Sequence, residues 1–227
     1  KGLEPLAILL FEQAAEDPEA EALPFVDPEK GVESVEAALA GARDIIAEFV
    51  SEDQRAREKM RELYHDKGVM KSKVLSGKEE EGIKYRDYYA WEEPLLSAPS
   101  HRVLAIRRGE KEGFLSLRIM PAEEEALSLL EALFIRGSGP APEQVRLALQ
   151  DGYKRLLSSS IEAEIRLGSK KKADEAAIRV FAENLRQLLL APPLGGKNVL
   201  AIDPGFRTGC KVVCLDRQGG LLVNDTI

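Results

Sequence analysis

Cysteine, histidine and aromatic residues are all scarce in this chain of 227 residues. Its two cysteines cannot build a disulfide framework, so a reducing compartment is expected. His65 and His101 have no ligand-like spacing with each other or with the cysteines, so the sequence predicts no metal site. No apolar run approaches the roughly 18 residues that a membrane helix needs, and the first residues lack the features of a secretory signal. We therefore expect no membrane partner.

The residues that are present are typical of a folded protein. Hydrophobic residues make up 44% of the chain and charged residues 31%, which excludes disordered and low-complexity classes. The sequence does not begin with Met, and it stops at Ile227 inside an expected strand. We therefore expect a fragment of a longer protein.

The charge is distributed unevenly along the chain. Residues 1–51 carry 3 basic and 12 acidic groups, whereas residues 52–119 carry 15 basic and 13 acidic groups. The acidic first quarter would repel a phosphate backbone. Contacts with nucleic acid would therefore depend on local basic patches farther along the chain.

A helical period dominates residues 1–193, where apolar residues recur three and four positions apart. Within this region, residues 52–75 are a candidate helix-turn-helix, with Gly68 in the turn and Lys71 and Lys73 directed at a nucleic-acid groove. Many three-helix cores that bind no DNA share this pattern, so a purely structural role is the alternative.

Residues 101–119 interrupt the helical pattern with two alternating runs around a loop that contains glycine. This arrangement predicts a β-hairpin. Its cations could contact phosphates, although Glu110 and Glu112 favour an ordinary solvated hairpin. The nucleic-acid candidates here are Arg102, Arg107, Arg108 and Lys111.

Two further segments have both a functional and a structural interpretation. Tyr85, Tyr88, Tyr89 and Trp91 could stack on bases, but packing of the hairpin against helices is the stronger interpretation. Residues 170–172 are three lysines at an expected helix start, where positive charge opposes the helix dipole. They could meet an anion, but a solvated run of charge is favoured.

After the Pro- and Gly-rich residues 192–196, the period changes from 3.6 to 2. Residues 197–227 then predict three strands that begin a second domain. Its first strand ends at Asp203, and the sequence after it is Pro-Gly-Phe-Arg-Thr-Gly. RNase H-like nucleases place a first-strand Asp on Mg²⁺ and add carboxylates from later strands. Actin-like ATPases use a similar turn for phosphate, and a simple turn cap is the structural alternative.

The residues around Asp203 resemble the YqgF-like domain of the Tex family of bacterial transcription accessory proteins. The opening Gly-Leu-Glu-Pro-Leu-Ala of residues 2–7 and the segments at residues 77–89 and 99–109 are also similar to that family. The resemblance covers essentially the whole chain, with the motifs in the family's order. The expected fold is mainly α with an embedded β-hairpin, followed by the first three strands of an incomplete α/β RNase H-like domain.

The resemblance implies a cytoplasmic, nucleic-acid-binding transcription factor about three times this length. Members bind RNA or DNA mainly through domains outside this region, and the transcription machinery is an expected partner. We therefore expect a scaffold and interaction region without a cofactor, and not an enzyme. Asp203 would be an inherited, inactive position, and Arg207 a further nucleic-acid candidate. The alternative is a metal-dependent nuclease whose other carboxylates lie beyond residue 227.

Overall fold

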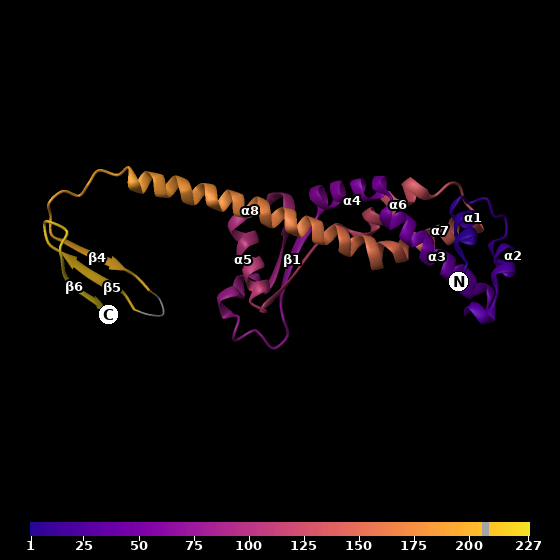
Figure 1. Ribbon diagram of the computed structural model, residues 1–227, viewed down its shortest axis with the longest axis horizontal. Helices are drawn as coiled ribbons and strands as arrows, with labels where there is room; N and C mark the ends of the chain where they lie inside the picture. The colour runs from indigo at the N-terminus through magenta and orange to yellow at the C-terminus, as the bar shows by residue number, and fades with distance from the viewer. Residues whose placement is uncertain (206–208) are drawn as a thin grey trace. The chain divides into compact units, whose positions relative to one another are not determined.

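The computed structural model describes residues 1–205 and 209–227 and divides into two units, Lys1–Ile178 and Arg179–Ile227 (Figure 1). Helices dominate the first unit, as the sequence predicts. None of the helices in the described part of the chain is long and apolar enough to cross a membrane.

The N-terminal part of the first unit is a helical bundle. Side-chain caps set where two of its helices begin: Ser34 Oγ accepts the Ala37 N–H at 3.1 Å, and Asp53 Oδ1 accepts the Ala56 N–H at 2.9 Å. The elements are α1 (Glu4–Phe11), α2 (Pro18–Ala22), η1 (Leu23–Phe25), η2 (Pro28–Lys30), α3 (Val35–Glu52), α4 (Gln54–Lys67), α6 (Glu123–Phe134) and α7 (Pro140–Gly152).

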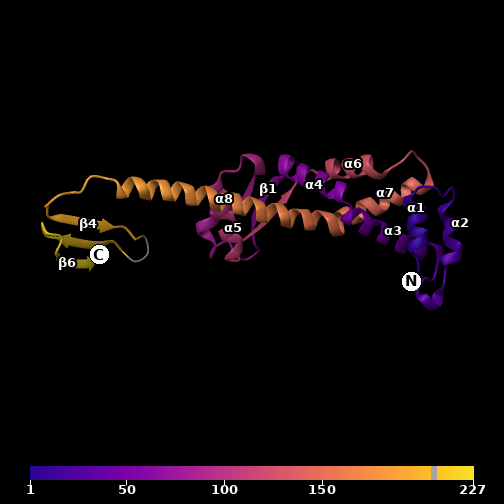
Figure 2. The same ribbon diagram turned by 45° about the horizontal axis from the view of Figure 1, so that its top comes forward.

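Helices α3 and α7 lie side by side in this bundle (Figure 2). Ala42 and Ile46 of α3 are fully buried, as are Val145 and Leu149 of α7. A side chain at Gly152 would lie 3.0 Å from the Ala47 Cβ, so the glycine permits this close approach. The bundle core is therefore continuous across both helices.

A small antiparallel sheet forms a second core in the same unit. β1 (Val69–Val74) lies between β2 (Ala90–Pro94) and β3 (Leu115–Met120). The inward residues of β1 and β3 are buried, and α5 (Ser100–Lys111) packs against them. The short helices η3 (Ile83–Tyr88) and η4 (Leu95–Ser97) precede and follow β2 in sequence.

The predicted helix-turn-helix at residues 52–75 is wrong. α4 ends before Gly68, and the residues that follow form β1, the central strand of the sheet. In β1, inward residues are buried and Lys71 and Lys73 are exposed. This alternation has the period of a strand, which indicates β structure where a second helix was expected.

The predicted β-hairpin at residues 101–119 is also wrong, because residues 100–111 form α5 and only residues 115–120 form a strand. Val103 and Ile106 are buried three positions apart, and Gly109 is buried three positions farther on. That spacing matches a helix face. Gly113 has a φ of 78° in the turn between α5 and the strand that follows it. The embedded β structure is therefore the three-stranded sheet.

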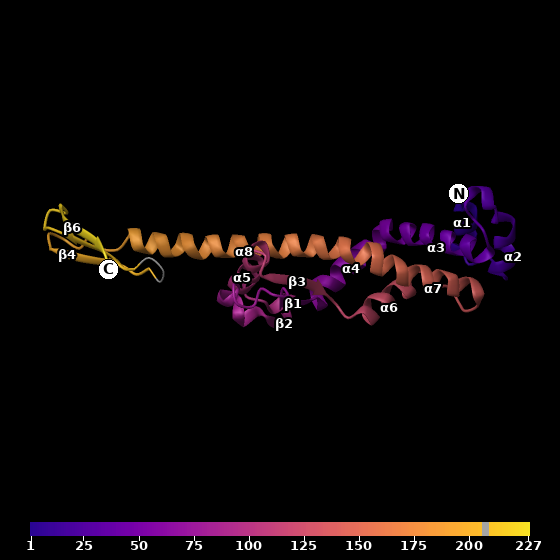
Figure 3. The ribbon, with the colours of Figure 1, turned by 90° about the horizontal axis from the view of Figure 1, so that it is seen from below.

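A long helical stretch follows the bundle. α7 continues through a π-helical segment, η5 (Tyr153–Leu157), into α8 (Ser158–Leu189) without a break. Within the first unit, α8 runs along the β3 edge of the sheet (Figure 3).

The second unit contains β4 (Val199–Asp203), β5 (Lys211–Leu215) and β6 (Leu221–Thr226) in an antiparallel meander. These are the three strands that the sequence predicts. Gly219 has a φ of 81° in the β5–β6 turn, where Asp216 Oδ1 accepts the Gly220 N–H at 2.7 Å. Apolar side chains on both faces are exposed, including Ile202 and Leu222.

Candidate nucleic-acid interface

The arginines of α5 were the leading phosphate candidates, and the first of them is held by the fold. The Arg102 guanidinium lies 4.6 Å from the centroid of the Trp91 ring and donates to Glu93 on the same strand, β2. Cation–π contact and an ion pair together position this side chain. Arg102 therefore fastens α5 to the sheet.

Arg107 is likewise held by a carboxylate. Its Nη1 donates to Glu110 Oε2 at 2.6 Å, and the other oxygen of Glu110 accepts from Arg166 of α8. Arg166 also donates to the Leu117 carbonyl at 2.9 Å. A chain of charged contacts thus connects α5, α8 and β3.

Two of the predicted cations remain on the surface. Arg108 and Lys111 are exposed on α5, and neither has an ion pair among the residues that the structure describes. They lie three positions apart, hence on one side of the helix. Arg207 lies outside the described residues. The part of the predicted patch that stays free to meet a phosphate is therefore Arg108 and Lys111.

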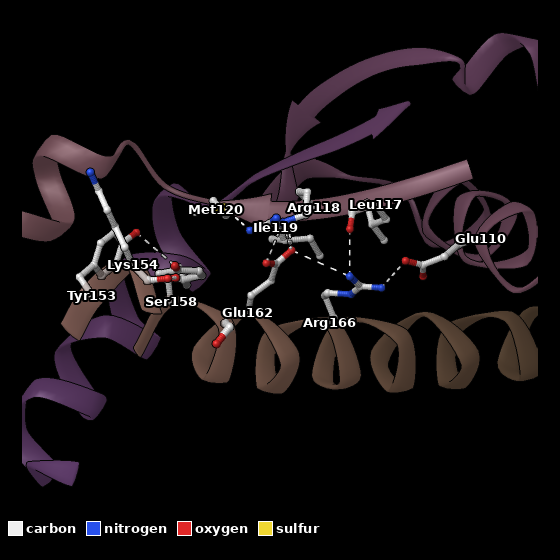
Figure 4. Close-up of polar contacts among 12 residues, drawn as sticks. Glu110, Leu117, Arg118, Ile119, Met120, Tyr153, Lys154, Ser158, Glu162 and Arg166 are labelled. Atoms are coloured by element: carbon white, nitrogen blue, oxygen red, sulfur yellow. Dashed lines mark hydrogen bonds and ion pairs between the residues drawn. The ribbon is translucent and has the colours of Figure 1, made fainter. Parts of the chain in front are cut away.

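The edge of β3 that faces away from β1 carries a group of contacts that the sequence did not reveal (Figure 4). Glu162 Oε1 accepts the Ile119 N–H at 2.9 Å, and Arg166, one helical turn along α8, donates to the Leu117 carbonyl. Arg118 Nε donates to Glu162 Oε2 at 3.0 Å. Side chains of α8 therefore satisfy backbone groups that a fourth strand would otherwise bind.

Glu162 and Arg166 have a spacing that gives no hint of this role. In sequence they are an ordinary i, i+4 pair on a helix, which is usually solvated. The Glu162 side chain is only 7% exposed. Only the packing of α8 against β3 distinguishes it from the many other acidic residues.

The outward face of the sheet carries a shallow groove of about 680 Å³. Lys71 and Arg118 lie directly opposite each other there, and Lys73 follows on β1. Lys71 pairs with Glu92 at 3.1 Å and Arg118 with Glu162. Carboxylates thus pair with two of the three cations, which weakens the attraction of the groove for a phosphate.

The aromatic segment packs into the second core, although the hairpin that it was expected to hold against helices does not form. Tyr85 is buried and lies 6.0 Å from Phe114 between ring centroids, and Tyr88 meets Trp91 edge to face at 6.0 Å. Burial raises the pKa of the Tyr85 hydroxyl. The rings consequently serve the second core of the first unit.

The lysines at residues 170–172 do not open a helix, because they lie in the middle of α8. The expected conflict with a helix dipole is therefore wrong. Lys170 pairs with Asp174 one turn farther along. Lys171 and Lys172 are exposed.

Asp203 ends β4, where its cross-strand neighbour is Lys211. Gly209 follows with a φ of 81°, and a side chain there would meet the Ile227 carbonyl oxygen at 2.5 Å. Within residues 1–205 and 209–227, no three His, Cys, Asp or Glu side chains come together as a metal site would require.

Both units match families of known proteins. Residues 13–181 match the Tex central region-like family, and residues 197–227 match the Tex protein YqgF-like domain. The chain is 41% identical over 230 residues to the uncharacterized protein YdcI of Bacillus subtilis and 35% identical over 242 residues to the transcriptional accessory protein Tex of Neisseria gonorrhoeae. It is 26% identical over 240 residues to the human S1 RNA-binding domain-containing protein 1.

Each of these alignments covers 100% of this chain, but only 32%, 30% and 24% of the respective relatives. The chain thus spans about a third or less of their length. Its architecture is that of a helical central region followed by the start of a YqgF-like domain. The chain belongs to the Tex family.

Proposed function

We propose that this chain is part of a nucleic-acid-binding transcription accessory factor, in which it acts as a scaffold and interaction region. Family membership carries the proposal, since one relative is named a transcriptional accessory protein and another an RNA-binding domain protein. RNA or DNA would be bound mainly by domains outside residues 1–227, and the transcription machinery would be a further partner. A cytoplasmic location belongs to the same proposal.

The ion pairs of the first unit support a scaffold role. Arg102, Arg107 and Arg166 are all engaged by carboxylates or backbone within the unit. Phosphate contacts would require cations that are free to neutralise phosphates and so release the counterions of the nucleic acid. Arg102 and Arg166 instead connect α5 and α8 to the sheet, and Arg107 is held by Glu110 on its own helix.

We also propose that the region is not catalytic. Two-metal phosphodiester cleavage needs two or three carboxylates around the metal ions. Asp203 faces Lys211 across the β4–β5 pair, and the described residues bring no acidic cluster to it. The nuclease alternative would need carboxylates beyond residue 227.

Binding across a salt series tests the scaffold proposal. We expect the 227-residue chain to bind labelled single-stranded RNA and duplex DNA at low salt only, and far more weakly than a full-length relative. Tight binding would contradict the scaffold proposal if log affinity falls steeply with log salt concentration and this slope becomes shallower in the double variant Arg108→Ala, Lys111→Ala. Incubation of a full-length relative with both substrates and Mg²⁺ or Mn²⁺ tests catalysis, since cleavage lost on replacing its counterpart of Asp203 with Asn would show a nuclease.

A further inference from the structure

A cavity of about 230 Å³ opens between α4, η4, the start of α5 and α8. Its lining is mainly aliphatic, with Leu95, Val103 and Ile165 among the residues that form it. The described residues around it include no Phe, Tyr or Trp. His65 adds an imidazole to the lining, but this ring is hydrogen-bonded to Asp66 at 2.8 Å. A mainly apolar lining of this kind suits an aliphatic side chain better than a nucleobase, which aromatic residues usually stack upon.

Gly168 forms one wall of this cavity in the middle of α8. A glycine in a helix interior costs about 0.5–1 kcal/mol relative to alanine. A Cβ at Gly168 would meet no atom of residues 1–205 or 209–227 within 4 Å, so close packing among these residues does not require a glycine there. Its backbone is helical, so a left-handed conformation does not require one either. The missing side chain keeps the cavity open.

The charged residues at the mouth of the cavity give it a positive side. Glu164 is already bound by two arginines, with Arg61 Nε donating at 2.6 Å and Arg57 bound to the other carboxylate oxygen. Lys172 also lines the cavity, and no carboxylate in the described part of the chain pairs with it. The uncompensated charge at the mouth is therefore that of Lys172.

We propose that this cavity is a docking site for a short acidic segment of a partner protein. A leucine or isoleucine side chain of that segment would enter beside Gly168, and a neighbouring carboxylate would meet Lys172. The assignment goes beyond the proposed function, because it does not depend on any contact with RNA or DNA.

The test uses a fluorescein-labelled dodecapeptide in which leucines alternate with aspartates and glutamates, and a matched peptide with serine in place of leucine. Fluorescence anisotropy of the peptide measures its binding to the 227-residue chain. NMR measures the shifts of the chain's backbone amides. We expect the leucine peptide alone to bind and to shift the amides of Gly168 and Lys172. Gly168→Leu, which fills the cavity, and Lys172→Glu should each weaken binding by about tenfold or more, equivalent to about 1.4 kcal/mol.

Two variants of α8 serve as matched controls. Lys171→Glu makes the same charge change one residue away from the cavity, and Ala177→Leu adds a leucine at an exposed site that does not line it. Both should bind the peptide as the unchanged chain does. The Gly168→Leu variant should unfold at the same or higher urea concentration, since its side chain meets open space. If Gly168→Leu fails to fold, the comparison of Lys172→Glu with Lys171→Glu tests the proposal in its place.

Three results would overturn the assignment. The first is the absence of amide shifts at Gly168 and Lys172 at millimolar leucine peptide. The second is equal binding of the serine peptide. The third is that the peptide binds the 227-residue chain but not a full-length relative with the same cavity residues. In that case the relative's own chain would cover the cavity. RNA binding in the salt series would be unaffected by Gly168→Leu, so failure here is distinguishable from failure of the proposed function.

Discussion

The two three-stranded sheets of this chain have the same size and antiparallel pairing but differ in how they are covered. In β2–β1–β3, α5 covers one face and α8 side chains satisfy an edge, so Ile119 is 1% exposed. In β4–β5–β6, Ile202 is 57% exposed. The exposed strands are nevertheless the more apolar ones in sequence, for example Val-Leu-Ala-Ile in β4 against Val-Met-Lys-Ser in β1.

Apolar content and burial are therefore separate properties of a strand. β1 alternates between buried and exposed residues, as a sheet with one covered face requires. β4 has a continuous apolar run, which is typical of sheets covered on both faces in α/β domains. The residue pattern of β4 is thus that of a strand covered on both faces, whereas the alternation in β1 matches a sheet covered on one face.

The largest expected effect comes from truncating equivalent isoleucines in the two sheets. Ile119→Ala should lower the free energy of unfolding of the first unit by about 3 kcal/mol, because it opens a cavity in a closed core. Ile202→Ala should change stability by less than about 0.5 kcal/mol, because the side chain is already exposed. Urea unfolding followed by circular dichroism measures both, and equal losses would contradict the comparison.

A smaller effect is expected from the edge of β3. Glu162→Ala leaves the Ile119 N–H without its acceptor and should cost about 2 kcal/mol. Glu175→Ala is the matched control, since Glu175 is exposed on the same helix and has no ion pair among the described residues. Hydrogen exchange at Ile119 should rise in the first variant alone. An unchanged exchange rate would show that Glu162 does not protect this edge.

The smallest effect concerns pH. The hydrogen bond from Arg61, together with that from Arg57, holds the pKa of Glu164 below its ordinary value of 4.5. The native state therefore favours the carboxylate, so its contribution is present above pH 4.5 and is lost as the pH falls through the lowered pKa. Because Glu164 is 40% exposed, Glu164→Gln should cost less than about 1 kcal/mol at pH 7.

Urea unfolding of Glu164→Gln and of the unchanged chain from pH 7 to pH 2 measures this difference. It should shrink toward zero at the acidic end, where both side chains are neutral. Glu175→Gln is the control and should show no such pH-dependent difference. A Glu164→Gln deficit that stays constant down to pH 2 would mean that packing, and not charge, is the cause.

Residue periodicity predicted the helical first region and the three C-terminal strands because these patterns are local. It failed at residues 101–108, where three arginines and four aliphatic residues fit either a strand or a helix over so short a run. It also failed after Gly68, where a second helix was expected despite the alternating pattern of β1, the central strand of the sheet. Motif resemblance found Asp203 but could not show which charged residues would be engaged.

The sequence by itself determined the family, the helical character and the apolar strands, because each depends on the order of residues along the chain. Tertiary structure alone decided which of the many charged side chains are available. Arg102 and Arg107 are bound, whereas Arg108 and Lys172 have no ion pair with any of the described residues. The physical reason is that an ion pair depends on distances of a few ångströms between segments far apart in sequence, and such distances arise only once α5, α8 and β3 have packed together.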